Sequence, residues 1–294
     1  MFFIRATRHG LAAVAIAVVM LLAAPASAQE PSAPPDPNPG NLTFTGSMDV
    51  LNTYMFRGIR QDDTKVIMWP ALDLGMSVYS GDGGLKSAAF NVGSWNSLHT
   101  GSAGSDGPSG KLWYEGDFYA TLGLGFGGGV ALSTTYTAYT SPNNAFSTVK
   151  ELAFKLAVDD SAYLGAAALK PYVLVAQEFD TAPGLGQADG GENAGTYLEL
   201  GVAPGWASEA VALAFPVKVG LSAGDYYELR GVDNKFGYAS VGALVTVPLG
   251  GTTMFGAWNV HGGVEFQTLG DTTKAINNDD ASKIIGSFGF GLSY

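Results

Sequence analysis

Few residues in this chain of 294 could carry covalent chemistry, since it has no cysteine and 3 histidines. The lack of cysteine excludes disulfides, thiolate catalysis and lipidation of cysteine. Ser97 and His99 could supply a nucleophile and its base, but the sequence shows no third residue to orient the histidine. His99 with Asp106 is a poor second pair, and His261 lies beside Asn259 within a strand-like segment. We therefore expect no catalytic residues and no enzyme.

Acidic and amide side chains gather in the polar segments, including residues 271–280. That run lacks the spacing of a calcium-binding loop, and solvation of turns is the more ordinary role of such residues. The sequence contains no His, Asp and Glu cluster with metal-ligand spacing and no phosphate-binding loop. We therefore expect no metal and no cofactor.

The composition narrows the fold class. Charged residues make up 14% of the chain, against roughly 25% in ordinary soluble domains, and the 41 glycines are about twice the usual share. Hydrophobic residues make up 47%, yet beyond residue 28 no segment approaches the ~20 unbroken apolar residues of a membrane-spanning helix. These proportions argue against a helical membrane protein and against a disordered chain. They indicate a β protein rich in glycine and aromatic residues.

Residues 1–28 have the pattern of a secretory signal peptide. Arg5 and Arg8 precede an apolar stretch, and residues 26–28 form a small-x-small cleavage site. We expect cleavage there and a proline-rich periplasmic linker over residues 29–41. Without the two arginines, 13 of the 15 basic residues remain against 26 acidic ones, a formal net charge of −13. Nucleic acid is therefore excluded as a partner.

From residue 42 to residue 294, apolar and polar side chains alternate. Phe118 and Leu122, for example, alternate with Glu115 and Asp117. Because successive strand side chains point to opposite sides, each such segment predicts a strand with one apolar and one polar face. About twelve such segments follow one another, or roughly ten to fourteen if one hairpin is miscounted. We expect an all-β, transmembrane, antiparallel up-and-down barrel of about twelve strands.

Short and long polar connections alternate between the predicted strands. The short ones are residues 80–85, 126–129, 159–162, 207–210 and 250–253, and the long ones are 58–65, 99–110, 141–147, 180–194, 226–235 and 270–280. Outer-membrane barrels have short periplasmic turns, longer outer loops and an apolar face toward lipid. The pattern predicts that arrangement, with both chain ends on the periplasmic side. Pro171 and Pro216 lie deeper in the segments, so we expect a bulge or a different strand boundary there.

The last segment keeps its alternation up to a terminal aromatic residue. Four of its residues fit a pattern of polar-x-Gly-x-x-apolar-x-aromatic: Ser287, Gly289, Leu292 and Tyr294. This resembles the C-terminal insertion signal of bacterial outer-membrane β-barrels. The resemblance implies insertion into the cell outer membrane by the barrel-assembly machinery, with the lipid of that membrane as a partner.

A second motif lies near the start of the barrel. Residues 52–61 read NTYMFRGIRQ and contain a Y-x-F-R-G-x-x-Q pattern, in which Arg57 and Gln61 carry the match, while Arg60 and the two aspartates at 62 and 63 depart from it. It resembles the start of the TorF-like family of outer-membrane porins, over the first few strands and with no matching signature downstream. The resemblance implies a porin-like protein.

The polar face is the surface on which function would lie. Its predicted acids are Asp49, Asp73, Glu115, Asp117, Glu151, Glu178, Glu199 and Glu265, and its predicted bases are Arg57, Lys111, Lys155, Lys170 and Lys218. Charge rings set pore selectivity, and this excess of acids mildly favours cations. Inward glycines such as Gly93 and Gly201 would leave space in the interior. We expect solute contacts at Arg57, Asp73, Trp95, Trp113, Glu115, Asp117, Lys155 and Lys218.

We interpret the chain as a narrow porin-like channel of the outer membrane for passive passage of small hydrophilic solutes. A barrel of twelve strands is intermediate in size between small barrels, which side chains fill, and wide porins. A plugged barrel through which nothing passes is therefore a further alternative. One alternative is a structural or adhesive barrel whose outer loops bind a partner, which deletion of residues 180–194 would test. The other, less favoured, is an outer-membrane hydrolase using His99 or His261.

Overall fold

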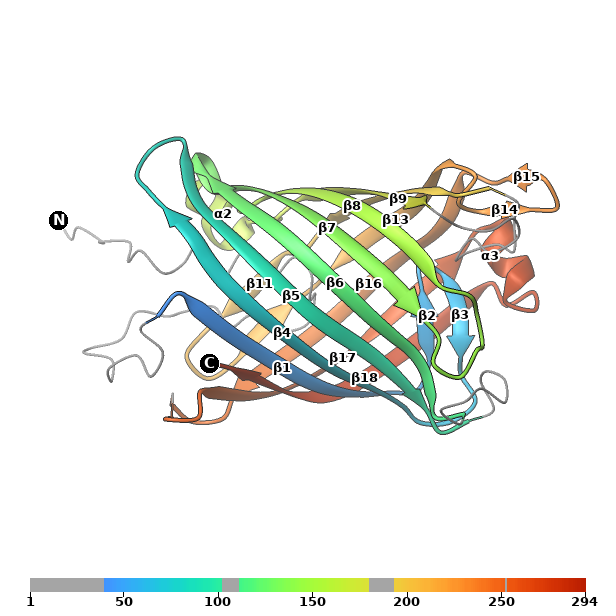
Figure 1. Cartoon of the computed structure of the whole chain (residues 1–294), viewed down its shortest axis with the longest axis horizontal. Coiled ribbons are helices and arrows are strands. Elements are labelled where there is room, and N and C mark those ends of the chain that lie inside the picture. The colour runs from blue at the N-terminus through green and yellow to red at the C-terminus, as the bar shows by residue number, and fades with distance from the viewer. Residues whose placement is uncertain (1–39, 102–110, 180–192, 252) are drawn as a thin grey trace.

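The computed structural model describes residues 40–101, 111–179, 193–251 and 253–294. Its main sheet closes on itself as a barrel (Figure 1). The twelve wall strands are β1 (Leu42–Leu51), β4 (Ile67–Ser80), β5 (Leu85–His99), β6 (Trp113–Phe126), β7 (Val130–Thr140), β8 (Val149–Val158), β9 (Tyr172–Phe179), β10 (Thr196–Val202), β13 (Val217–Gly224), β16 (Phe236–Pro248), β17 (Ala257–Leu269) and β18 (Ser282–Ser293). Each pairs antiparallel with the next, and β1 pairs with β18, as at Met48↔Phe290. The predicted up-and-down barrel of about twelve strands is confirmed.

The predicted signal peptide and nearly all of the predicted linker lie outside the described residues.

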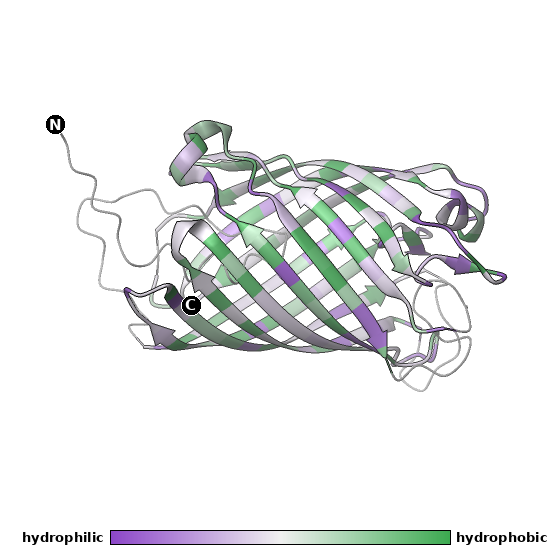
Figure 2. Ribbon diagram, turned by 90° about the horizontal axis from the view of Figure 1, so that it is seen from above, coloured by the Kyte–Doolittle hydropathy of each residue, from purple (hydrophilic) through white to green (hydrophobic). Residues whose placement is uncertain are grey.

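The two faces of the wall separate as the alternation predicts. On β6, Phe118 and Leu122 point outward and are 58% and 45% exposed, whereas Asp117 and Thr121 point inward and are 6% and 3% exposed. Figure 2 shows this alternation of hydropathy along the strands. A closed sheet pairs its backbone groups internally, so its apolar outer face suits lipid. A soluble barrel with its apolar side chains inside is excluded.

The two ends of the barrel differ. Tyr294 and Phe44 exchange two backbone hydrogen bonds of 2.7 Å at one end, where the chain also turns through η1 (Gly127–Gly129). We call this the turn end. The opposite end, the loop end, carries β2 (Tyr54–Phe56), β3 (Ile59–Asp62), β14 (Glu228–Leu229), β15 (Val232–Asp233) and α3 (Asp271–Ile276) (Figure 1). Among the described residues, no helix is both long enough and apolar enough to span a membrane.

The connection between β8 and β9 differs from the tight turn expected at residues 159–162. It runs over residues 159–171 and contains α2 (Ser161–Leu164) and η2 (Gly165–Ala167). Pro171 therefore belongs to the connection and directly precedes β9. The prediction that short and long connections alternate strictly is wrong at this position. Pro171 has no backbone N–H to donate to the neighbouring strand, so β9 begins only after it.

Two further prolines interrupt wall strands. Beyond Pro204 the line of β10 resumes as β11 (Gly205–Ala207), and β12 (Ala212–Ala214) precedes Pro216 and β13. The proline carbonyls still accept hydrogen bonds, from the backbone N–H of Phe215 to Pro204 and of Gly242 to Pro216, both at 2.8 Å. The wall therefore stays closed around local breaks.

Candidate functional site at the loop end of the barrel

The connection between β1 and β4 folds into the barrel as a hairpin of β2 and β3, which we call the inner hairpin (residues 54–62). Its tip is Arg57-Gly58, with φ angles of 48° and 83°, as a two-residue type I′ turn requires. The inner hairpin meets three well-separated wall strands, through Trp69 on β4, Glu151 on β8 and Tyr238 on β16. It therefore lies across the interior at the loop end (Figure 1).

An aromatic cluster holds the base of the inner hairpin. The ring centroid of Tyr54 lies 5.1 Å from Trp69, 5.5 Å from Trp95, 6.0 Å from His99 and 6.5 Å from Tyr114. Tyr54 is 3% exposed. Aromatic pairs of this kind add about 0.5–1.5 kcal/mol each beyond the area that they bury. Trp95, a predicted solute contact, thus faces the interior but is covered by the hairpin.

A β-bulge places Trp113 outside the barrel. The register between β5 and β6 shifts so that Ser97 pairs with Glu115 and Leu98 pairs with Trp113. Leu98 faces outward, and so does its partner Trp113, which is 39% exposed; Tyr114 takes the interior position instead and is 7% exposed. The expectation that Trp113 lines the interior is wrong, because a bulge reverses the alternation on which it depended.

The tip of the inner hairpin places a guanidinium among wall residues. Arg57 donates from Nη1 and Nη2 to the two carboxylate oxygens of Glu151 at 2.5 and 2.9 Å, and from Nη1 to the hydroxyl of Tyr226 at 3.0 Å. Its Cζ lies 4.2 Å from the ring centroid of Tyr197. The side chains of Arg57 and Glu151 are 12% and 2% exposed. The predicted contact Arg57 is thus inside the barrel, with its charge neutralised by Glu151.

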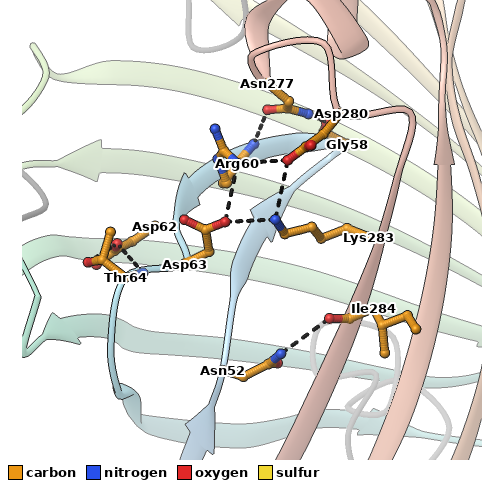
Figure 3. A network of polar contacts seen from close by, with 10 residues as sticks. All are labelled: Asn52, Gly58, Arg60, Asp62, Asp63, Thr64, Asn277, Asp280, Lys283 and Ile284. Atoms are coloured by element: carbon orange, nitrogen blue, oxygen red, sulfur yellow. Dashed lines mark hydrogen bonds and ion pairs between the residues drawn. The ribbon is translucent and has the colours of Figure 1, made fainter.

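Four charges fasten the inner hairpin to the start of β18 (Figure 3). Arg60 pairs with Asp63 at 3.2 Å and with Asp280 at 3.0 Å, and Lys283 pairs with the same two carboxylates at 2.7 and 3.4 Å. Asn277 adds two 2.8 Å hydrogen bonds to the hairpin backbone. The hydrogen bond from Lys283 holds the pKa of Asp63 below its usual value, with further help from Arg60. Cations and anions alternate in this network, so each charge is compensated.

Below the hairpin, tyrosine side chains pack along the inner face of the wall. Glu199 accepts hydrogen bonds from Tyr172, Tyr197 and Tyr238 at 2.7, 2.5 and 2.9 Å. A Cβ on Gly201 would overlap the ring of Tyr172. The inward glycine therefore makes room for a tyrosine of the neighbouring strand. This corrects the expectation that such glycines leave open space.

Three more predicted contacts face the interior and have partners there. The Nζ of Lys155 lies 3.9 Å from the ring centroid of Tyr172, and that of Lys218 lies 3.4 Å from Glu265. Asp73 accepts hydrogen bonds from Asn91 on the adjacent strand β5 at 2.6 Å and from Tyr119 on β6, one strand further along, at 3.1 Å. Each charge is thus engaged by a neighbour.

The predicted contacts Glu115 and Asp117 are neighbouring buried acids on the inner face of β6, 2% and 6% exposed. Within the described part of the chain, Oδ1 of Asp117 has no hydrogen-bond partner. In that same part, no group of three or more His, Cys, Asp or Glu residues could hold a metal ion. These acids therefore line the interior near the hairpin.

The inner hairpin supplies the third member that the sequence did not show for Ser97 and His99. His99 Nε2 lies 2.7 Å from Ser97 Oγ, and His99 Nδ1 lies 3.2 Å from Oδ2 of Asp62, although these last two atoms are not aligned for a hydrogen bond. The indole N–H of Trp69 donates to Ser97 Oγ at 3.0 Å. Ser97, His99 and Asp62 are 0%, 1% and 5% exposed. Asp106, the partner considered from the sequence, lies outside the described residues.

The residues that match the insertion signal lie in β18 or directly after it: Ser287, Gly289, Leu292 and Tyr294. Ser287 and Gly289 are on the inner face, while Leu292 and Tyr294 are on the outer face. A Cβ on Gly289 would meet Asp49 and His261, which pair at 2.7 Å. The glycine of the signal thus makes room for a buried contact between a histidine and an aspartate.

Together, the closed wall and its apolar outer face define a β-barrel of the outer-membrane type.

No protein-family model and no curated protein matches the sequence. Similar solved structures include the outer membrane channel from Pseudomonas putida F1 (11% identity, TM-score 0.46, 90% of this chain and 100% of that chain). The translocator domain of the autotransporter NalP from Neisseria meningitidis is 12% identical, with a TM-score of 0.44 over 87% and 89% of the two chains. The outer membrane phospholipase A from Escherichia coli is 12% identical, with a TM-score of 0.40 over 84% and 92%. A likeness at this level does not indicate function.

Proposed function

We propose that the chain is a narrow channel of the bacterial outer membrane for passive passage of small hydrophilic solutes, and that the inner hairpin closes it in this conformation. The observation that carries the proposal is that the wall is complete without the hairpin, because twelve other strands close the circle. The hairpin is held by side-chain contacts and ion pairs and adds no strand to the wall. Its withdrawal would leave a hydrated bore lined by charged side chains.

The interior charge supports a mild preference for cations. Among the described residues, the inward acids are Asp49, Asp73, Glu115, Asp117, Glu151, Glu178, Glu199 and Glu265, and the inward bases are Arg57, Lys155, Lys218 and Lys283. Lys111 and Lys170, which were expected to face inward, are instead exposed in connections. An excess of carboxylates in a narrow bore raises the local concentration of cations and repels anions.

The proposal includes the route to the membrane. The signal peptide would direct the chain to the periplasm, and the barrel-assembly machinery would recognise the C-terminal signal and insert the barrel into the outer membrane. The resemblance of residues 54–61 to TorF-like porins supports a channel of this kind, since those residues form most of the inner hairpin.

Planar-bilayer recordings test the channel. The wild-type chain is compared with a variant in which a Gly-Ser linker replaces residues 53–63, after both show heat-modifiable migration in electrophoresis. We expect small, brief currents from the wild type and a larger steady conductance from the variant. In a salt gradient, we expect both proteins to show a reversal potential whose sign indicates selectivity for cations. If neither protein passes current above the lipid background in several salts, the channel proposal is wrong.

We also propose that the chain is not an enzyme, although Ser97, His99 and Asp62 are arranged in the order of a nucleophile, base and orienting acid. Ser97 is wholly buried, and Asp62 belongs to the hairpin that would have to move to admit a substrate. Exposing the serine therefore displaces the acid. We expect no adduct with a fluorophosphonate ester. An adduct on Ser97 that disappears in His99→Ala would instead support a hydrolase.

A further inference from the structure

The contacts around Arg57 have the composition of a guanidinium-binding site. The carboxylate of Glu151 meets the guanidinium edge through two hydrogen bonds. The rings of Tyr197 and Tyr226 lie 4.2 and 5.4 Å from Arg57 Cζ, and Tyr226 also accepts a hydrogen bond through its hydroxyl. A planar cation held at its edge by a carboxylate and at its face by aromatic rings is bound in a way that a tetrahedral ammonium cannot reproduce.

The site belongs to the wall and a loop, and only its occupant comes from the hairpin. We define the guanidinium cage as Tyr139 on β7, Glu151 on β8, Tyr197 on β10 and Tyr226 in the connection after β13. Tyr139 donates its hydroxyl proton to Oε1 of Glu151 at 3.1 Å, which orients the carboxylate. The three tyrosines are 7%, 1% and 1% exposed. The cage is therefore built entirely by residues outside the hairpin.

The contacts that hold Arg57 in the guanidinium cage permit its exchange for a free ligand. Arg57 has a φ of 48°, in the left-handed region that costs a residue other than glycine free energy. The Asp280 carboxylate that helps to hold the hairpin is 46% exposed, so water and salt weaken that attachment. A free ligand with the chemistry of the arginine side chain can therefore compete with Arg57 for the cage.

We propose that the guanidinium cage recognises small solutes that carry a guanidinium group, and that Arg57 occupies it as an internal substitute while the channel is closed. This rests on the proposed function, since a solute reaches the cage through the barrel interior. Arg57 is tethered, so its effective concentration is of the order of millimolar or higher. A solute at a comparable concentration displaces it and releases the hairpin tip. Guanidinium solutes thereby open the path that they use.

The test measures binding to the purified full chain in detergent micelles by ligand-observed NMR titration. The probes are methylguanidinium and methylammonium, and the variant is Arg57→Ala, which empties the cage. We expect methylguanidinium to bind this variant at least about tenfold more tightly than methylammonium does. Binding should weaken at least about tenfold in Arg57→Ala with Glu151→Gln, because the bidentate partner has lost its charge. Arg230→Ala is the matched control: it removes an exposed arginine of the loop end that touches neither the cage nor the hairpin attachment, so it should bind methylguanidinium no better than the wild type does.

Three results would overturn the proposal: a folded Arg57→Ala protein that does not bind methylguanidinium, equal binding of both probes, or binding that persists unchanged without the Glu151 charge. Heat-modifiable migration checks folding. If Arg57→Ala does not fold, Arg57→Lys decides, because its ammonium keeps Glu151 neutralised but fills the cage poorly; methylguanidinium must then bind at least about tenfold more tightly than to the wild type. Binding is measured without current. A protein that binds but does not conduct therefore refutes only the channel.

Discussion

Arg57 and Glu151 are separated by 94 residues in the chain, yet they meet through two hydrogen bonds of 2.5 and 2.9 Å inside the barrel. One residue is at the tip of the inner hairpin and the other on β8, so this pair determines where the hairpin tip lies. Both side chains are largely buried. Salt screens a buried pair weakly, and loss of one partner leaves the other charge uncompensated.

Glu151→Gln should release the tip of the inner hairpin. The change keeps the shape of the side chain but removes its charge, and breaking a buried pair at one partner costs about 3 kcal/mol. Because the chain has no cysteine, a single Met55→Cys substitution reports exposure of the hairpin to a maleimide. We expect its modification to accelerate by about a hundredfold. Glu265→Gln, which removes another inward acid that pairs with Lys218, should leave the rate unchanged. Equal rates in the two variants would contradict the prediction.

Tyr54→Ala should undock the base of the inner hairpin. The substitution removes a buried ring that packs on Trp69 and Trp95, at a cost of about 3 kcal/mol. Tryptophan emission should shift to longer wavelength, and iodide quenching should increase as water reaches both indoles. Tyr136→Ala removes a tyrosine that is 38% exposed on the outer wall and should change neither reading. An unchanged spectrum in Tyr54→Ala would show that the hairpin is docked by other contacts.

Gly93→Ala should destabilise the barrel. A Cβ at this position would overlap the side chain of Tyr119 and crowd a backbone carbonyl, and overpacking of this kind costs about 1–3 kcal/mol. The measurement is the urea midpoint of unfolding in detergent. Gly286→Ala is the control, because the nearest atom to its Cβ would be Oδ1 of Asn52 at 3.9 Å. Similar midpoints for the two variants would show that the interior relaxes around the added methyl group.

Acid should weaken the attachment of the inner hairpin through Asp63. The Lys283 hydrogen bond lowers the folded-state pKa of Asp63, so the attachment is complete above the ordinary carboxylate pKa and is lost as pH falls through the lowered value. We expect conductance to be constant from pH 7 to about 5 and to rise below about pH 4. Asp63→Asn should raise conductance already at pH 7 and reduce the increase in acid. Asp82→Asn, at an exposed acid of the turn end, should behave as the wild type does.

Part of the site was visible in the sequence. The pattern in residues 54–61 marked Arg57, and the alternation predicted inward positions for Asp73, Glu115, Asp117, Lys155 and Lys218. Trp113 was misplaced because a bulge adds one residue to a strand without changing its composition. The aromatic residues Tyr54 and Phe56 were the available signal that this connection is packed against other parts of the chain, since a solvated loop seldom needs such side chains.

The amino-acid sequence by itself determined the barrel, its size of about twelve strands and, apart from the bulge at Trp113, the face that each strand turns to lipid. Alternation is a local property with a period of two residues, so it can be followed along the chain without knowing which strands pair. Only the tertiary structure decided that residues 54–62 fold inward, that Asp62 reaches His99, and that inward glycines hold tyrosine rings. Those outcomes depend on contacts between residues far apart in the chain, whose shapes and charges match only after the wall has closed.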